Sequence, residues 1–134
     1  MALRVVSAPV VAANTPFTIT VPGQEVWTIW SVFAVCARAV GGTPNRAYQL
    51  AVTDETSNLV VSPAADVGTE PGTCSVTWTD GSPSSVASGA TGISLGPLGK
   101  VVCPSGYRLI GTVLNGVAAD QWTTARAWVD VRAT

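Results

Sequence analysis

At 134 residues the chain is long enough for an apolar core of its own, and we expect a single domain over residues 1–134. Charged residues make up only 11% of it, against about 25% in a typical soluble domain, and the net charge is −1. The basic residues do not cluster, which argues against nucleic-acid binding, and no uncharged apolar stretch reaches the ~18 residues of a membrane span.

The N-terminal stretch, MALRVVSAPVVAAN, only weakly imitates a signal peptide, because Ser7 and Pro9 interrupt its apolar run. We therefore expect no cleaved leader. Cysteine occurs at three positions without C-x-x-C spacing, Cys36, Cys74 and Cys103. This pattern predicts buried apolar side chains rather than a zinc site or a disulfide framework. One bridge with a spare thiol is the alternative, and the sequence leaves open whether Cys74 and Cys103 can pair.

Turn signals rich in Gly, Pro and Asn recur about every ten residues, and the runs between them are rich in Val, Thr, Ile and Trp. This spacing is typical of an all-β sandwich or barrel. The predicted strands cover residues 4–12, 17–21, 25–40, 47–54, 58–62, 73–79, 107–114 and 120–131. We expect an antiparallel β-sandwich of about eight strands with almost no helix.

The run EVWTIWSVFAVCARAV, residues 25–40, is apolar on both faces of a strand. It exceeds the usual strand length of about 3–10 residues, so we expect a bend or bulge near Ser31. An antiparallel strand with one wet face alternates apolar and polar residues. Because this one does not, something should cover its second face.

Two later segments are predicted from their turn residues. Residues 81–99, GSPSSVASGATGISLGPLG, are rich in Gly and Ser and predict a long exposed loop, with a short strand near Ile93 to Leu95 as an option. Asn115-Gly116 is a strong hairpin signal. It predicts that 107–114 and 120–131 are neighbouring antiparallel strands.

The last predicted strand, DQWTTARAWVDV at residues 120–131, alternates between two different faces. One face carries Ala125, Ala127 and Val129, and we expect it to pack inside the sandwich. The other carries Trp122, Thr124, Arg126, Trp128 and Asp130. We expect this tryptophan face to be covered, either by the 81–99 loop or by another subunit.

Each catalytic or ligand-binding motif in the sequence lacks a residue or a spacing that its chemistry requires. Residues 92–96, GISLG, match the nucleophile-elbow pattern around Ser94, but the chain contains no histidine, so a Ser-His-Asp triad is impossible. The stretch GPLGKV lacks the spacing of a phosphate-binding loop. The carboxylates of Asp54-Glu55 and Asp66…Glu70 lack calcium-loop spacing and predict turns. We therefore expect no enzymatic activity, no cofactor and no metal.

The remaining signal is the tryptophans. Trp and Arg are enriched in the residues that dominate protein interfaces, and a surface with few charges suits a protein that partners cover. The predicted partner interface consists of Trp27, Trp30, Trp122, Arg126 and Trp128. Two classes of partner fit it: another protein, or sugar rings stacked on tryptophan.

Three stretches resemble small structural proteins of tailed bacteriophages that infect actinobacteria. They are PGQEVWTIWSV, NRAYQLAVTDETSNLVV and CPSGYRLIGTVLNGVAADQWTTARAWVDV, and they cover residues 20–62 and 103–131. The matching residues are Pro22, Trp27, Asn45, Arg46, Leu50, Val52, Asp54, Pro104, Gly106, Tyr107, Arg108, Asp120, Gln121 and Trp122. The resemblance implies a virion protein with a jelly-roll-like β-sandwich.

The leading hypothesis is a capsid decoration protein, assembled in the host cytoplasm, that binds the outer surface of the major capsid protein and stabilises the head. A minor tail or head–tail connector component is the alternative of the same class, since the sequence does not separate head from tail. A carbohydrate-binding module for host attachment, with an open tryptophan platform ringed by Asn, Asp and Gln, is the alternative of another class. Homo-oligomers usually close with cyclic symmetry. A trimer, which suits the three-fold positions of an icosahedral shell, is the first expectation, and a monomer bound to the capsid is the second.

Overall fold

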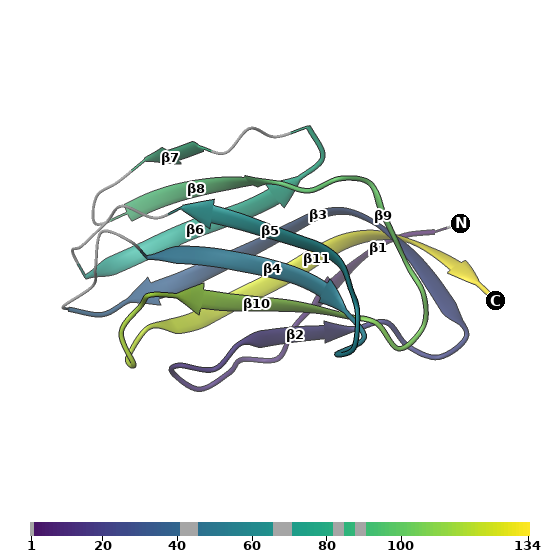
Figure 1. The fold of residues 1–134 in the computed structure, drawn as a ribbon, viewed down its shortest axis with the longest axis horizontal. Helices are drawn as coiled ribbons and strands as arrows, with labels where there is room; N and C mark the ends of the chain where they lie inside the picture. The colour runs from purple at the N-terminus through teal and green to yellow at the C-terminus, as the bar shows by residue number, and fades with distance from the viewer. Residues whose placement is uncertain (1, 41–45, 66–70, 82–84, 88–90) are drawn as a thin grey trace.

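The computed structural model describes residues 2–40, 46–65, 71–81, 85–87 and 91–134, and in these ranges it contains strands and no helix (Figure 1). The strands are β1 Ala2–Ser7, β2 Phe17–Thr20, β3 Glu25–Arg38, β4 Ala47–Thr53, β5 Asn58–Ala65, β6 Gly72–Thr79, β7 Ser85–Ala87, β8 Thr91–Pro97, β9 Val101–Cys103, β10 Arg108–Leu114 and β11 Gln121–Ala133. The all-β prediction is confirmed, and each of the eight predicted strands overlaps one of these.

The strands form two sheets that pack face to face, with the four-stranded sheet in front in Figure 1. The seven-stranded sheet has the order β1-β11-β3-β6-β8-β7, with β9 paired to β3, and the four-stranded sheet has the order β2-β10-β4-β5. Without β7, β8 and β9, the eight remaining strands are ordered 1-8-3-6 and 2-7-4-5. This is the strand order of a jelly roll, with β7–β9 inserted before its seventh strand. The β-sandwich is antiparallel throughout except for the parallel pair β6–β8.

The prediction of an exposed loop over residues 81–99 is wrong for β7 and β8, and β8 lies beside β6. The short strand given as an option near Ile93 to Leu95 is confirmed, since it lies within β8. Gly92, Ser94 and Leu98 are buried there. Gly96 is also buried, and a Cβ atom on it would lie 2.6 Å from the Trp78 ring. The small residues of this segment therefore serve close packing rather than exposure. Because β8 belongs to the same sheet as β11, it does not cover the tryptophan face of that strand.

The hairpin predicted at Asn115-Gly116 is also wrong. Asn115 does take the left-handed conformation, with a φ of 54°. However, β10 pairs with β2 and β4 in one sheet, whereas β11 pairs with β1 and β3 in the other. The connection between them crosses from sheet to sheet instead of turning back within one.

The bulge expected near Ser31 is present, with Trp30 as the extra residue of β3 opposite β11. A bulge changes which face the following residues occupy. Before it, Trp27 and Ile29 point into the sandwich, and after it Val32, Ala34 and Cys36 do. The segment looks apolar on both faces largely because its inward face changes parity at this point.

A second bulge, at Thr123 in β11, explains Trp122. The register passes from Trp122 opposite Cys36 to Thr124 opposite Val35, so Thr123 has no partner of its own. Trp122 therefore shares the inner face with Ala125, Ala127 and Val129, and only 2% of it is exposed. Its ring packs against Phe17 and Tyr48, with centroids 5.1 and 5.4 Å away.

The three cysteines are buried and free, as expected for apolar core side chains. Cys36 and Cys74 face each other across β3 and β6. Burial raises the pKa of the Cys36 thiol to about 12, and the nearby Asp120 charge acts in the same direction. Burial alone raises the pKa of Cys103 to about 12.

Candidate functional site

The five residues of the predicted partner interface do not share one surface. Trp27 and Trp122 lie in the core with 1% and 2% exposed, so their assignment to an interface is corrected. The Trp27 indole donates a hydrogen bond of 2.8 Å to Glu25 beside it. Trp30, Arg126 and Trp128 remain on the outside, all on the outer face of the seven-stranded sheet.

Strand register places these three residues next to one another. Arg126 lies opposite Phe33 of β3, and Trp128 lies opposite Val5 of β1 on one side and Ser31 on the other. Trp30 is the bulged residue beside Ser31. The tryptophans and the arginine thus occupy adjacent rows on β11 and β3, next to the edge strand β1.

The surrounding outer surface carries exposed apolar side chains on β1, β3, β8 and β9, with a row of Ser and Thr on β6 between β3 and β8. It includes Leu3, Val5, Trp30, Ile93 and Val102, which are 70, 50, 39, 52 and 52% exposed. Four half-buried side chains fill the spaces between them, Phe33, Val35, Leu95 and Trp128. We call these nine residues the outer apolar face. Leu3 and Val5 lie on either side of Arg4 in β1, a spacing that was readable in the sequence. That they share one outer face with Ile93 of β8 and Val102 of β9 became apparent only from the strand order.

Few charged residues lie near the outer apolar face. Three are on β11, and Lys100 is at the rim of the face. Arg126, Asp130 and Arg132 project from β11 on the outer side. The Lys100 ammonium lies 5.0 Å from the centre of the Trp30 ring, within range of a cation–π contact. This contact occupies one side of the exposed indole.

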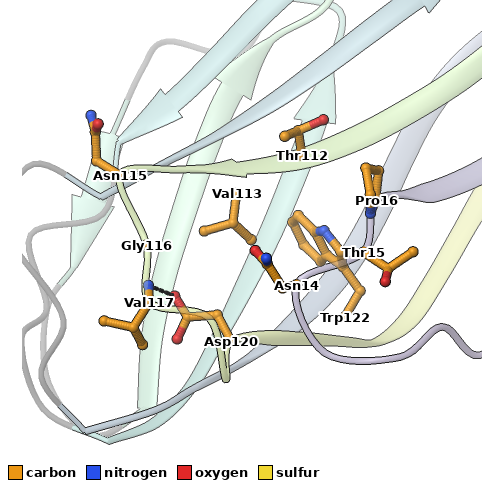
Figure 2. Close-up of a pocket in the computed structure, with 10 residues that line it drawn as sticks. All are labelled: Asn14, Thr15, Pro16, Thr112, Val113, Asn115, Gly116, Val117, Asp120 and Trp122. Carbon is orange, nitrogen blue, oxygen red and sulfur yellow. Dashed lines mark hydrogen bonds between the residues drawn. The ribbon is translucent and has the colours of Figure 1, made fainter.

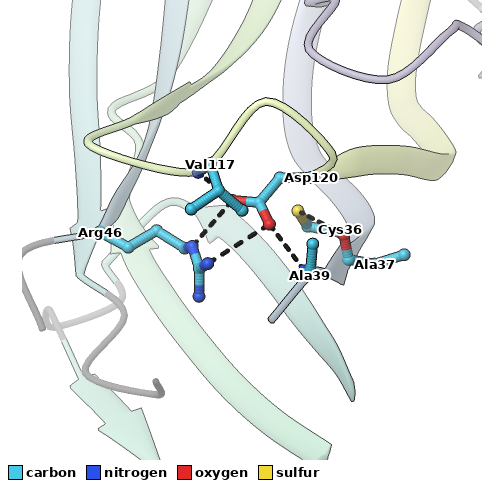
Figure 3. Close-up of polar contacts among 6 residues, drawn as sticks. All are labelled: Cys36, Ala37, Ala39, Arg46, Val117 and Asp120. Atoms are coloured by element: carbon cyan, nitrogen blue, oxygen red, sulfur yellow. Dashed lines mark hydrogen bonds and ion pairs between the residues drawn. The ribbon is translucent and has the colours of Figure 1, made fainter. Parts of the chain in front are cut away.

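A second constellation lies at one end of the sandwich, where Arg46 and Asp120 form a buried ion pair (Figure 3). Arg46 Nε donates to Asp120 Oδ2 at 2.9 Å, and the guanidinium also reaches Oδ1 at 3.3 Å. The backbone N–H groups of Ala39 and Val117 complete the shell at 2.8 and 3.1 Å. Asp120 therefore ties together β3, the start of β4 and the β10–β11 connection.

Beside Asp120 is a pocket of about 190 Å³ between the β1–β2 and β10–β11 connections (Figure 2). It is lined by Asn14, Thr15, Pro16, Thr112, Val113, Asn115, Gly116, Val117, Asp120 and Trp122. The Asn14 N–H donates to the Asp120 carbonyl at 2.9 Å, which joins the two connections at the base. The sequence offered no signal for this pocket, since its residues come from two stretches that lie far apart in the chain, 14–16 and 112–122.

Asp54, Glu55 and Arg108 hold the turn between β4 and β5. The Asp54 carboxylate accepts hydrogen bonds from the backbone N–H groups of Ser57 and Thr56 at 2.6 and 2.8 Å. These bonds lower its pKa, that from Ser57 most. Arg108 pairs with Glu55 of the same turn. The prediction that Asp54-Glu55 belong to a turn is confirmed.

Ser94 lies in the sandwich interior, where its hydroxyl donates to the Ala65 carbonyl, so it is placed as a packing residue. Among the described residues, no cluster of three or more His, Cys, Asp or Glu side chains is arranged to hold a metal ion. That part of the chain also has no helix of a length and hydropathy suited to crossing a membrane. Comparisons with protein-family models, curated proteins and solved structures found no significant match.

Proposed function

We propose that this protein is a structural component of a tailed-phage virion and is held in the particle through its outer apolar face. The observation that carries the proposal is the exposure of Leu3, Val5, Ile93 and Val102 on one sheet, around Trp30 and Trp128. Soluble monomers seldom expose contiguous apolar patches beyond a few hundred Å², and larger ones mark interaction sites. A protein partner would remove this surface from water.

The composition of the face favours a protein over a sugar as its partner. A sugar-binding platform needs an open tryptophan ring surrounded by side chains that bond hydroxyl groups. The outer rows of β1, β3 and β8 carry Leu, Val, Phe and Ile, and Lys100 sits over the Trp30 ring. The polar side chains next to Trp128 are Ser31, Arg126 and Asp130. Apolar side chains around a central Trp–Arg cluster are instead what interface cores contain.

Two further points support a virion role. The jelly-roll strand order occurs in viral capsid proteins, although that fold also hosts other functions. The motif residues Arg46, Asp120 and Trp122 serve the scaffold, in keeping with their resemblance to phage structural proteins. We place the protein on the head, as a decoration protein bound to the major capsid protein, with a trimer as its own state. A tail or connector position is the second candidate.

The test compares two matched surfaces. Trp128→Ala with Arg126→Ala, and separately Val5→Asp, alter the outer apolar face, whereas Val61→Asp alters the outer side of the four-stranded sheet. Val5 and Val61 are similarly exposed, at 50% and 47%, so the two aspartates differ mainly in location. The readouts are native mass, far-UV circular dichroism and cosedimentation with phage heads that lack this protein.

We expect the outer-face variants to keep the β-sheet spectrum and to bind heads at least about tenfold more weakly, since two hot-spot residues or one buried charge are affected. Val61→Asp should bind as the wild type does. Wild-type binding to isolated tails but not to heads would move the assignment to the tail. Unchanged mass and unchanged particle binding in the folded Trp128/Arg126 variant would show that this face is ordinary surface.

A further inference from the structure

Two of the three cysteines lie directly opposite each other in the larger sheet. Cys36 of β3 and Cys74 of β6 are register partners in an antiparallel strand pair. Both side chains point into the sandwich, and both residues are 0% exposed. The two thiols therefore lie on the same face of the sheet and at the same level along the two strands.

The register of this pair meets the geometric requirement for a disulfide bond. Directly opposite residues of antiparallel strands have Cα atoms about 4.5 or 5.5 Å apart, depending on their place in the ladder. Disulfide-bonded cysteines have Cα atoms about 4.4–6.8 Å apart. The Cβ atoms of opposite residues are about 4.5–5.5 Å apart, and a disulfide needs about 3.5–4.5 Å. A small approach of the two strands thus brings the sulfur atoms into bonding distance.

Cys103 is buried as deeply, but its place in the sheet is different. Its register partner is Trp27, which lies near the other end of β3 from Cys36. At about 3.3 Å per residue, the two positions on β3 are roughly 25–30 Å apart. Cys103 is therefore out of reach of both other cysteines, although it is nearer to Cys74 in the sequence than Cys36 is.

The hydrogen bonds from the two facing thiols are long. Cys36 Sγ lies 3.8 Å from the carbonyl oxygen of Ala37. Cys74 Sγ lies 3.9 Å from the carbonyl oxygen of Ser75 and 3.7 Å from the Ser94 hydroxyl. A thiol is a weak hydrogen-bond donor, so the loss of these contacts on oxidation costs little.

We propose that Cys36 and Cys74 form a cross-strand disulfide when the protein meets a low-molecular-weight disulfide such as oxidised glutathione, and that Cys103 remains a thiol. One protein thiolate attacks a sulfur of the small disulfide, which forms a mixed disulfide and releases one small thiol. The second protein thiolate attacks the first protein sulfur and releases the other small thiol. Two electrons pass to the oxidant, and two protons from the protein thiols end on the released thiols.

Burial decides when this reaction takes place. Burial, followed by the Asp120 charge, raises the pKa of Cys36 to about 12, and a charge on Cys74 acts in the same direction. The thiolate is the attacking species, so the closed sandwich protects Cys36 near neutral pH. The bond therefore forms during folding or through opening of the β3–β6 pair, and the strand register selects the partners. This inference concerns the core and is independent of the proposed virion role.

The experiment maps the cysteine pairing of the full chain after two oxidations. In the first, the reduced protein refolds from urea in a buffer of reduced and oxidised glutathione near neutral pH. In the second, the same buffer holds enough urea to keep the chain unfolded. Remaining thiols are alkylated, and peptide masses assign the bond. Cys36→Ala and Cys103→Ala are matched variants, since each removes one fully buried thiol.

We expect the refolded wild type to lose two hydrogen atoms in its intact mass and to carry the alkyl group on Cys103 alone. The unfolded chain should give a mixture in which Cys74–Cys103 is at least as frequent as Cys36–Cys74, because closing the shorter loop costs less entropy. Cys103→Ala should form the bond as the wild type does, and Cys36→Ala should keep its two remaining thiols.

The bond should also stabilise the fold, because a fold that favours a bond is favoured by that bond to the same extent. We expect the urea midpoint of the oxidised wild type to lie at least about 1 M above that of the reduced protein. Cys103→Ala should show the same shift on oxidation, and Cys36→Ala should show none.

Four outcomes would overturn the proposal. They are a refolded wild type that keeps all three thiols, a bond that includes Cys103, the same mixture of pairs in the folded and unfolded chains, and a urea midpoint that does not rise on oxidation. The pairing map and the midpoint are both measured on the wild type. The test therefore stays valid even where Cys36→Ala does not fold.

Discussion

At the scale of single residues, the Asp120 carboxylate is the joint between segments that lie far apart in the sequence. It accepts hydrogen bonds from Ala39, Arg46 and Val117 while only 3% of the residue is exposed. Removing one partner of a buried ion pair leaves the other charge without compensation, which costs far more than the pair contributes over an apolar substitute. The stability of this end of the sandwich therefore depends on both charges together.

Asp120→Asn keeps the shape of the side chain and removes its charge. We expect the free energy of unfolding to fall by about 3–5 kcal/mol, because Arg46 stays buried with its charge uncompensated. Urea unfolding measures the loss. The matched control is Asp130→Asn on the partly exposed outer side of β11, which should change stability by no more than about 0.5 kcal/mol. Equal effects in the two variants would contradict the structural role of Asp120.

At the scale of elements, the packing of β2 depends on a glycine in its neighbour β10. It has four residues and pairs with β10, where Phe17 lies opposite Gly111. A Cβ atom on Gly111 would lie 1.8 Å from the Phe17 ring. The phenyl ring thus occupies the space that a side chain at position 111 would need. On its other side the ring packs against the Trp122 indole.

We expect Gly111→Ala to displace Phe17 and to lower the free energy of unfolding by about 1–3 kcal/mol, the usual cost of overpacking a core. Hydrogen exchange should accelerate in β2 before it does in β4. Gly99→Ala is the control, because no atom lies within 4 Å of its added Cβ. A Gly111→Ala protein as stable as Gly99→Ala, with normal protection in β2, would show that the two strands separate easily.

At the scale of the whole molecule, burial of two thiols in the sandwich makes the free energy of unfolding fall as the pH becomes alkaline. The thiols of Cys36 and Cys103 have their pKa raised from 9.0 to about 12, chiefly by burial. Below about pH 9 both the folded and unfolded chains hold these protons, so the two groups add no pH dependence. Between about pH 9 and 12 the unfolded chain loses them first, and folding becomes less favourable as pH rises.

Each thiol then contributes a slope of up to roughly 1.4 kcal/mol per pH unit. We expect urea unfolding under reducing conditions to show stability falling from about pH 9 upward, and the slope to flatten in the Cys36→Ala, Cys103→Ala double variant. The comparison between the two proteins removes the contribution of other groups that titrate in this range. Identical slopes would mean that these thiols ionise in the folded state as they do in water.

Much of the fold follows from local pattern in the sequence. The eight strands of the jelly roll, the burial of the three cysteines and the bulge of β3 near Ser31 follow from residue type, turn spacing and strand length. The inward Ala125, Ala127 and Val129 of β11 follow from simple alternation. These features depend on neighbours a few residues away, and the physical chemistry of the backbone acts over that range.

The candidate sites depended on the tertiary structure. Alternation placed Trp122 outside, but one unpaired residue at Thr123 reversed its side, and alternation alone does not reveal a one-residue bulge. The outer apolar face required the strand order that brings β1, β8 and β9 to the same sheet. The pocket required β10 and β11 to part into different sheets, where the turn at Asn115 had indicated a hairpin. The sequence by itself determined which segments are strands. Long-range packing around Arg46, Asp120 and the apolar core decided which strands pair and which side chains share a surface. Contacts between distant segments carry no local signature in the sequence.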